Sequence, residues 1–196
     1  MAKVTNTGAG ALKLVKPDAI VVTLFAGDET DDIPKGDSYV LDDVIRDTTS
    51  IAQDDNSTSD IERETSDMPI LSVVTSGKYQ IAAEVADTQK DLLVALCDFT
   101  YDEMTKKVYA PAAYRTKYAK VDVVFGTKAV VVPKVQLNSK VTMESLNTSI
   151  GKIALAGTAQ LATLKIGSSG SQKTIKTPYY LDENYTMPAG SKVDSL

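Results

Sequence analysis

Three apolar runs rich in β-branched residues constrain most strongly what this chain can fold into. They are Ala19–Ala26, Tyr118–Phe125 and Ala129–Leu137. Runs of this length and composition are typical of buried strands and are short for a core helix. Pro133 lies inside the third run. Because proline is tolerated in a sheet only at an edge or a bulge, we expect that strand at a sheet margin.

Two further segments complete the core that the pattern predicts. Ile70–Val74 and Lys78–Val85 have strand character, and Ser76–Gly77 between them predicts a hairpin over 70–85. Gly151–Leu164 is predicted as a strand interrupted at its central glycine.

One segment has helical periodicity instead. Apolar residues recur at intervals of three and four between Leu92 and Phe99. Thr88 is placed to cap the first turn, with Asp91 three residues later in the capping-box position. We therefore predict a helix at about 88–99. Together with the strands, it makes a mainly β fold with one flanking helix.

The two ends of the chain differ from its middle in composition. Residues 1–18 are polar and contain two glycines, so we predict an N-terminal arm. Gly167–Gln172 has the composition of a flexible linker, and three tyrosines follow it. We therefore predict a single core domain over 19–166 and a C-terminal extension over 167–196, and leave open whether the extension docks on its own subunit or on another.

A polar, acidic stretch, Asp47–Asp67, interrupts the strands. Most hairpin connections are about two to five residues long, so an excursion at about 47–69 is either functional or disordered. Between Asp28 and Asp67 the chain has fourteen acidic and three basic residues, whereas the remainder has twelve acidic and eighteen basic. Charges segregated in this way can repel other molecules, steer their approach, or pair with the opposite patch on a neighbouring copy. A solvated acidic loop is the simpler alternative.

The composition excludes several kinds of chemistry. The net charge of −5 argues against binding nucleic acid by neutralising its phosphates. Histidine is absent and cysteine occurs once, which excludes Ser-His-Asp and Cys-His nucleophiles, the HExxH helix and CxxC sites. Neither a dinucleotide-binding nor a P-loop glycine motif is present, so we predict no cofactor. Cys97 lies between Leu96 and Asp98, without the neighbouring cation or base that activates a thiol.

The carboxylates of the acidic stretch suggest two other functions, and both fail. An EF-hand starting at Asp54 needs glycine and glutamate where Ser59 and Thr65 stand. A carboxylate pair for glycoside hydrolysis needs the raised pKa of a buried acid, which an exposed stretch does not supply. We therefore predict no metal site, no catalytic residue and no enzyme.

No run of the sequence is long and apolar enough for a secretory signal or a transmembrane helix. We therefore expect synthesis in a cytoplasm and no membrane insertion.

The acidic stretch and its flanks resemble a known family. The residues that carry the resemblance are Thr49-Ser-Ile-Ala-Gln-Asp-Asp, Thr58, Ile61-Glu-Arg-Glu-Thr-Ser-Asp-Met-Pro-Ile, Gly77-Lys-Tyr-Gln-Ile-Ala-Ala-Glu-Val-Ala-Asp and Leu92-Leu93. This order of strand, acidic β-arm, strand and helix resembles the tail tube (major tail) proteins of long-tailed bacteriophages. The resemblance covers roughly residues 40–100, so the chain ends lie outside it.

The resemblance implies a β-sandwich or barrel-like core whose long β-arm loop contacts a neighbouring subunit or the next ring. It also implies hexameric rings stacked into a virion tail tube, made in the host bacterial cytoplasm, through which the genome is ejected. Implied partners are other copies, the terminator, the tape measure protein and the baseplate hub, while DNA passes transiently through an acidic lumen.

Two sets of candidate contact residues follow. The inter-subunit or lumen-facing acidic set is Asp54, Asp55, Asp60, Glu62 and Glu64, and the complementary basic surface is Lys106, Lys107, Arg115, Lys117 and Lys120. Three alternatives stay open: the inner tube of a contractile injection system, another tail structural protein such as a terminator, and a monomeric β-domain that binds a small ligand or a glycan.

Overall fold

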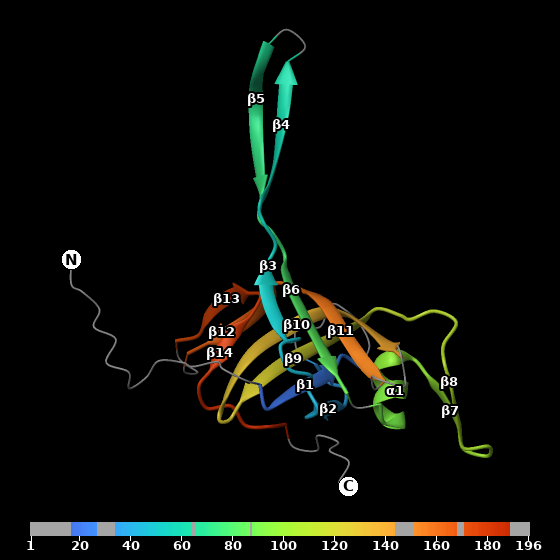
Figure 1. The fold of residues 1–196 in the computed structure, drawn as a ribbon. Helices are drawn as coiled ribbons and strands as arrows, with labels where there is room; N and C mark the ends of the chain where they lie inside the picture. The colour runs from blue at the N-terminus through green and yellow to red at the C-terminus, as the bar shows by residue number, and fades with distance from the viewer. Residues whose placement is uncertain are drawn as a thin grey trace.

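The computed structural model describes residues 17–26, 34–63, 66–86, 88–143, 151–167 and 171–188, and only the backbone within 60–63 and 66–73. This part of the chain forms antiparallel sheets and one helix (Figure 1), which confirms the predicted mainly β fold. In chain order the elements are β1 (Ala19–Leu24), β2 (Ser38–Leu41), β3 (Ser50–Gln53), β4 (Ser57–Arg63), β5 (Ser66–Thr75), β6 (Tyr79–Val85), α1 (Lys90–Cys97), β7 (Thr100–Asp102), β8 (Lys107–Tyr109), β9 (Lys117–Phe125), β10 (Lys128–Thr142), β11 (Lys152–Ala159), β12 (Ala162–Ile166), β13 (Lys173–Thr177) and β14 (Tyr180–Asp182).

The main sheet has the strand order β2-β1-β9-β10-β11-β6-β3, and β14 pairs with β10 beside this path. The chain that leaves β2 runs along β6, because the Ile45 N–H donates to the Glu84 carbonyl at 2.8 Å and Val44 pairs with Val85. The segment between β2 and β3 therefore joins the two margins of the sheet.

Both faces of the central strands are buried, which explains the uninterrupted apolar runs. Alternate residues of a strand point to opposite faces. Ile20 and Val22 of β1 lie in the main core with the apolar side of α1, whereas Val21 lies in a second cluster. Tyr180 and Tyr185 pack on that second cluster, so the C-terminal segment covers the outer face of the sheet.

The position of β10 corrects the prediction from Pro133. The strand lies at the centre of the sheet, between β9 and β11, and not at its margin. Its register against β9 shifts between Val132 and Val135, so the proline sits in a bulge. A bulge leaves a residue outside the hydrogen-bond ladder, and the missing N–H therefore costs no pairing there.

The predicted hairpin over 70–85 is wrong. β5 pairs with β4, whereas β6 pairs with β3 and β11. Residues 50–85 therefore form one long hairpin whose two strands separate briefly in the middle, and Gly77 lies at this interruption and not at a hairpin turn. Local periodicity found the strands but could not assign their partners.

The helix is shorter than predicted, and Thr88 does not cap it. The N-cap is Gln89, which has an extended backbone and makes no side-chain capping hydrogen bond. Leu92, Leu93, Leu96 and Cys97 are buried, as the apolar spacing predicted. The helix ends at Asp98 in the left-handed conformation, with φ of 58°.

The C-terminal strands dock on the same subunit. β12 and β13 form a hairpin, and the linker predicted from composition at Gly167–Gln172 joins them, although 168–170 lie outside the described residues. The preceding break falls at Gln160–Leu161 and not at Gly157 as predicted. A Cβ on Gly157 would lie 2.4 Å from Val135 Cγ1, so this glycine allows β11 to pack closely against β10.

Candidate assembly surfaces

The acidic stretch forms a projecting two-stranded ribbon, β4–β5, which is the most distinctive feature of the molecule. Figure 1 shows the ribbon standing away from the main sheet. Its strands pair with each other from Ser57↔Thr75 to Arg63↔Ser66, and within the described residues they pair with no other strand. An isolated two-stranded ribbon is only marginally stable in water, and its outer edges offer unpaired backbone groups. Such an element favours contact with another molecule.

Side chains and backbone fix the base of the ribbon. The contacts are Asp54 N–H to the Lys78 carbonyl at 2.9 Å, Gln53 Nε2 to the Gly77 carbonyl at 3.0 Å, Gly77 N–H to Asn56 Oδ1 at 3.0 Å, and Gln80 Nε2 to Asp54 Oδ2 at 2.9 Å. A Cβ on Gly77 would lie 1.7 Å from the Asp54 carbonyl oxygen. Only glycine allows the two segments of the chain, at Gly77 and Asp54, to approach so closely.

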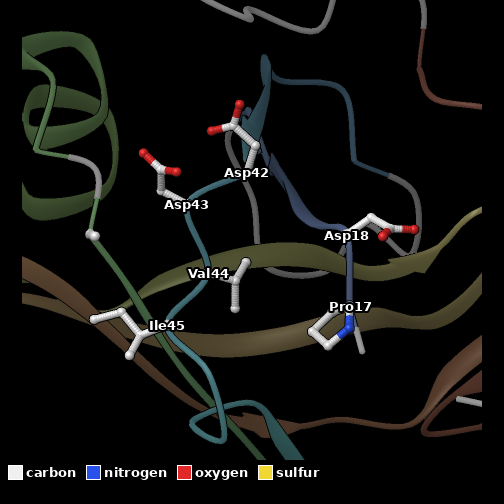
Figure 2. A pocket seen from close by; sticks show the side chains of 7 residues that line it. Pro17, Asp18, Asp42, Asp43, Val44 and Ile45 are labelled. Carbon is white, nitrogen blue, oxygen red and sulfur yellow. The ribbon is translucent and has the colours of Figure 1, made fainter. Parts of the chain in front are cut away.

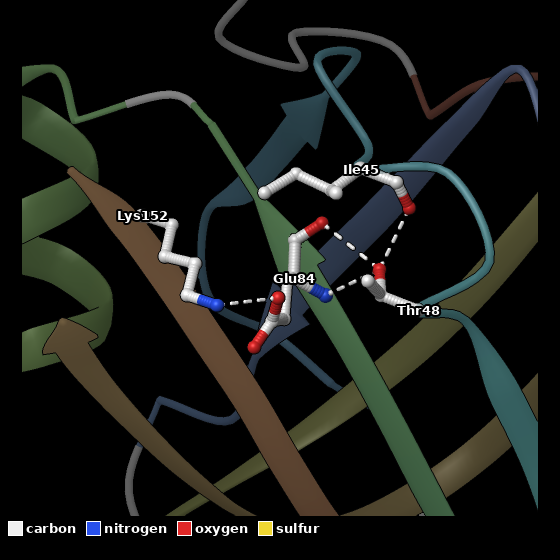
Figure 3. Close-up of polar contacts among 4 residues, drawn as sticks. All are labelled: Ile45, Thr48, Glu84 and Lys152. Carbon is white, nitrogen blue, oxygen red and sulfur yellow. Dashed lines mark hydrogen bonds and ion pairs between the residues drawn. The ribbon is translucent and has the colours of Figure 1, made fainter. Parts of the chain in front are cut away.

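A second set of contacts holds the segment that leads into β3 (Figure 3). The Thr48 hydroxyl donates to the Ile45 carbonyl at 2.7 Å and accepts from the Glu84 N–H at 3.1 Å. Lys152 of β11 pairs with the Glu84 carboxylate at 2.7 Å. Strand β6 is thus tied on both sides near its C-terminal end, at the opposite end of the strand from the ribbon.

The structure spreads the predicted acidic residues along the ribbon. Asp54 belongs to its base, and Asp55 is exposed beside it. Asp60 and Glu62 lie on β4, where only the backbone is described, and Glu64 lies outside the described residues. Their role in contacts between subunits remains a prediction.

A second projection, the β7–β8 hairpin, leaves the body beside α1 (Figure 1). Asp98 holds both of its ends, because one carboxylate oxygen lies 2.7 Å from Lys117 Nζ and the other accepts from the Arg115 N–H at 3.0 Å. Burial opposes the charge of Asp98, but the hydrogen bond and charge of Lys117, together with Arg115, outweigh it and lower the pKa of this carboxyl. Lys90 of α1 lies 4.7 Å from the centre of the Tyr101 ring and supports the first strand.

The turn of this hairpin is fixed by Asp102. Its carboxylate accepts from the Met104 N–H at 2.9 Å and from the Thr105 hydroxyl at 2.6 Å. The hydrogen bonds from Thr105 and Met104 lower the pKa of Asp102. Lys106 then adopts a left-handed backbone with φ of 55°. The turn therefore has a defined shape although it is fully exposed.

The predicted basic set divides into two groups. Lys106, Lys107 and Arg115 are exposed and have no ion-pair partner within the described part of the chain. Lys117 and Lys120 instead pair with Asp98 and Asp122 of their own chain, at 2.7 Å in both cases. The exposed group lies on and next to the β7–β8 hairpin.

Asp122, a fully buried carboxylate in β9, was missed by sequence reasoning. Its Oδ2 lies 2.7 Å from Lys120 Nζ and accepts from the Tyr185 hydroxyl at 2.8 Å, while Oδ1 has no partner among the described residues. Burial raises the pKa of Asp122, and burial together with the charge of Asp122 raises the pKa of Tyr185. The contact fastens the C-terminal segment. The sequence feature that could have indicated this buried carboxylate is the single acidic residue in the apolar run Tyr118–Phe125.

Two features of the described residues, the Cys97 thiol and a hollow bordered by three aspartates, lack the geometry of a reactive centre. Cys97 is buried, and desolvation raises its pKa to about 12, so the thiol stays protonated. A hollow near Asp42 and Asp43 also borders Asp18, but Figure 2 shows that the three carboxylates do not converge, and Asp18 accepts from the Gly126 N–H at 2.6 Å. No cluster of three or more metal-ligating side chains occurs among the residues described.

In the described segments, no helix is both long and apolar enough to span a bilayer.

Comparison with protein-family models gives no match, and no curated protein matches the chain. Among solved structures, the chain is similar to a component of the cryo-EM structure of the anti-feeding prophage (AFP) baseplate, 6-fold symmetrised. The similarity has a TM-score of 0.34 and 7% sequence identity, and covers 88% of this chain and 97% of that chain. At this TM-score, the likeness carries no argument about function.

Proposed function

We propose that this protein is a structural subunit of a bacteriophage tail tube, and that the β4–β5 ribbon is its contact arm. The observation that carries the proposal is the ribbon itself, which projects from a well-fixed base and pairs with no other strand of the described chain. An uncovered sheet edge promotes aggregation, so an exposed two-stranded ribbon is expected to be covered by a second molecule.

Three further properties support this proposal. The ribbon is acidic, whereas an exposed basic group lies on a separate projection, as a head-to-tail contact between unlike surfaces requires. The chain has no histidine, and its single cysteine is buried. The residue pattern over roughly 40–100 resembles tail tube proteins. In the full proposal, copies form hexameric rings that stack in the virion, contact terminator, tape measure and baseplate hub proteins, and let DNA pass through an acidic lumen.

Removal of the ribbon tests this function. Gln53 pairs with Tyr79, and the Asp54 N–H bonds to the Lys78 carbonyl, so an Asn-Gly turn in place of residues 55–77 would join the remaining strands in register. The shortened chain should retain its β circular dichroism spectrum and cooperative unfolding but form no rings or tubes by electron microscopy and sedimentation velocity.

Two results would contradict the proposal. One is a parent protein that stays monomeric at high concentration, with or without a tail initiator complex. The other is normal tube formation by the shortened chain. The deletion must remove both strands of the ribbon together. Removal of residues 54–66 alone would delete β4 and leave most of β5 without a partner strand.

A further inference from the structure

The β7–β8 hairpin combines exposed apolar side chains with a fixed backbone. Met104 at its turn is 94% exposed, and Tyr109 and Tyr114 are 49% and 44% exposed. Methionine, tyrosine and arginine are enriched in protein–protein interfaces, whereas an isolated exposed methionine on a rigid turn serves no purpose in the core of its own subunit. The clamp at Asp98 and the turn at Asp102 pre-organise this surface.

The backbone of the turn supports a binding role. Lys106 occupies a left-handed position that hairpins usually fill with glycine or asparagine, because a side chain with a Cβ is strained there. Backbone strain of this kind is concentrated at functional sites. A lysine therefore occupies a position where glycine would be more stable, which is consistent with a use for its charge.

The charge of the hairpin defines the partner chemistry. Lys106 and Lys107 form no ion pair in the described chain. The carboxylate of Asp102, the register partner of Lys107, is bound by Met104 and Thr105. The charge of Arg115 acts in part on Asp98. The partner should therefore combine carboxylates with an apolar strand. The stretch 54–67 contains six acidic residues and one arginine, and the apolar run Met68–Leu71 follows it directly.

We propose that the β7–β8 hairpin and the segment that follows it, through Met104, Tyr109, Tyr114, Lys106, Lys107 and Arg115, are the receptor for the β4–β5 ribbon of a second copy of this chain. This inference rests on the proposed function and names the surface that the arm contacts. The two projections stand apart in Figure 1, so one copy offers its ribbon and its hairpin to different neighbours. A contact between unlike surfaces propagates from copy to copy, and forms a ring when the rotation closes.

A charge exchange tests the pairing. The hairpin reversal Lys106→Glu/Lys107→Glu and the ribbon reversal Asp60→Lys/Glu62→Lys should each abolish assembly in sedimentation velocity. A 1:1 mixture of these two variants should assemble, because each then offers the charge that the other lacks. A chain carrying all four substitutions should assemble alone. The matched control Lys165→Glu/Lys173→Glu makes the same charge change on the β12–β13 hairpin and should assemble like the parent.

A second pair of variants tests the apolar contact. Met104→Ser should raise the concentration needed for assembly about tenfold, and Met104→Leu should leave it within about twofold, since one buried apolar side chain contributes on the order of 1.5 kcal/mol.

The inference is overturned if the hairpin reversal assembles like the parent, or if neither the mixture nor the fourfold variant restores assembly. Failure of the receptor is distinguishable from failure of the proposed function. If removal of the ribbon abolishes assembly but the hairpin-reversal variant assembles normally, only the proposal that the hairpin is the receptor is rejected. A parent chain that never assembles rejects the function itself.

Discussion

At the scale of single residues, Asp122 is the group with the clearest energetic consequence. It is fully buried, and one of its oxygens binds both Lys120 and Tyr185. Burial of a carboxylate disfavours its charged form, and the lysine and tyrosine offset only part of this cost. The side chain therefore holds the C-terminal segment in place and makes stability depend on pH.

The sign of this dependence follows from the raised pKa of Asp122. Above the ordinary value of 3.8, the folded chain retains a proton that the unfolded chain has released, so the free energy of unfolding falls as pH rises through the folded pKa. Asp122→Asn removes this contribution. We expect the difference in unfolding free energy, parent minus Asp122→Asn, to be largest near pH 4 and to decline towards pH 7 in urea titrations.

Tyr185→Phe provides the control. Loss of its hydrogen bond to the carboxylate should raise the pKa of Asp122 further, so the fall in the free energy of unfolding should continue to higher pH. A difference that stays constant or grows with pH would contradict the assignment.

At the scale of elements, the ribbon depends on the junction between its base and the sheet. Gly77 crosses Asp54 so closely that an added Cβ would lie 1.7 Å from the carbonyl oxygen. The hydrogen bond from Gln53 to the Gly77 carbonyl lies at the same place. The direction of the ribbon is therefore set by a few backbone contacts rather than by a hydrophobic core.

Gly77→Ala should disturb this junction without unfolding the domain. We expect a loss of about 2 kcal/mol, typical of a backbone clash with broken hydrogen bonds, and faster amide hydrogen exchange in β4 and β5 than in β9 and β10. Gly126→Ala is the matched control. Its φ is +62° but its Cβ would meet no atom within 4 Å, so it should cost about 1 kcal/mol and leave exchange in the ribbon unchanged. Equal protection of the ribbon in both variants would refute the role of Gly77.

The elements also show what the sequence could predict. The runs at Ala19–Ala26 and Tyr118–Phe125 and the helical spacing after Leu92 identified β1, β9 and α1 because burial imposes a local period. Strand partners were not predictable in this way. The central place of β10 depends on a bulge at Pro133, and the pairing of β5 with β4 depends on contacts distant from Ser76–Gly77.

The candidate surfaces were predictable only in part. The acidic stretch is apparent in the sequence, but its division into a clamped base and a projecting ribbon is not. Charge alone could not separate the exposed Lys106 from Lys117, whose partner Asp98 becomes a neighbour only through the fold. Lys120 and Asp122 are two residues apart on one face of β9, so their pairing needed only the strand period, but the burial of Asp122 needed the fold. The role of Met104 required the exposure that only the structure supplies.

At the scale of the whole molecule, the two projections give the proposed assembly an electrostatic character. Charges on exposed surfaces interact within a Debye length of about 10 Å at 0.1 M salt and about 3 Å at 1 M. The acidic ribbon and basic hairpin should therefore bind less tightly as salt increases.

We expect the concentration at which the parent assembles to rise at least about tenfold between 0.05 M and 0.5 M sodium chloride, as measured by light scattering. The chain with all four charge substitutions should show the same trend, because its signs are exchanged but its attraction is preserved. Assembly that is unaffected or strengthened by salt would indicate an apolar contact instead.

The length of the ribbon has a geometric consequence. A strand rises about 3.3 Å per residue, so the seven residues of β4 extend roughly 23 Å beyond the base. Two residues added to each strand would lengthen this reach by about 7 Å and return every side chain to its original face, whereas one residue would turn every side chain over. The reach of the β4–β5 ribbon and the facing of its side chains are therefore coupled between Ser57 and Ile61. An odd insertion would keep the facing only where a bulge absorbs it, as the register shifts between Ile61 and Arg63 already do.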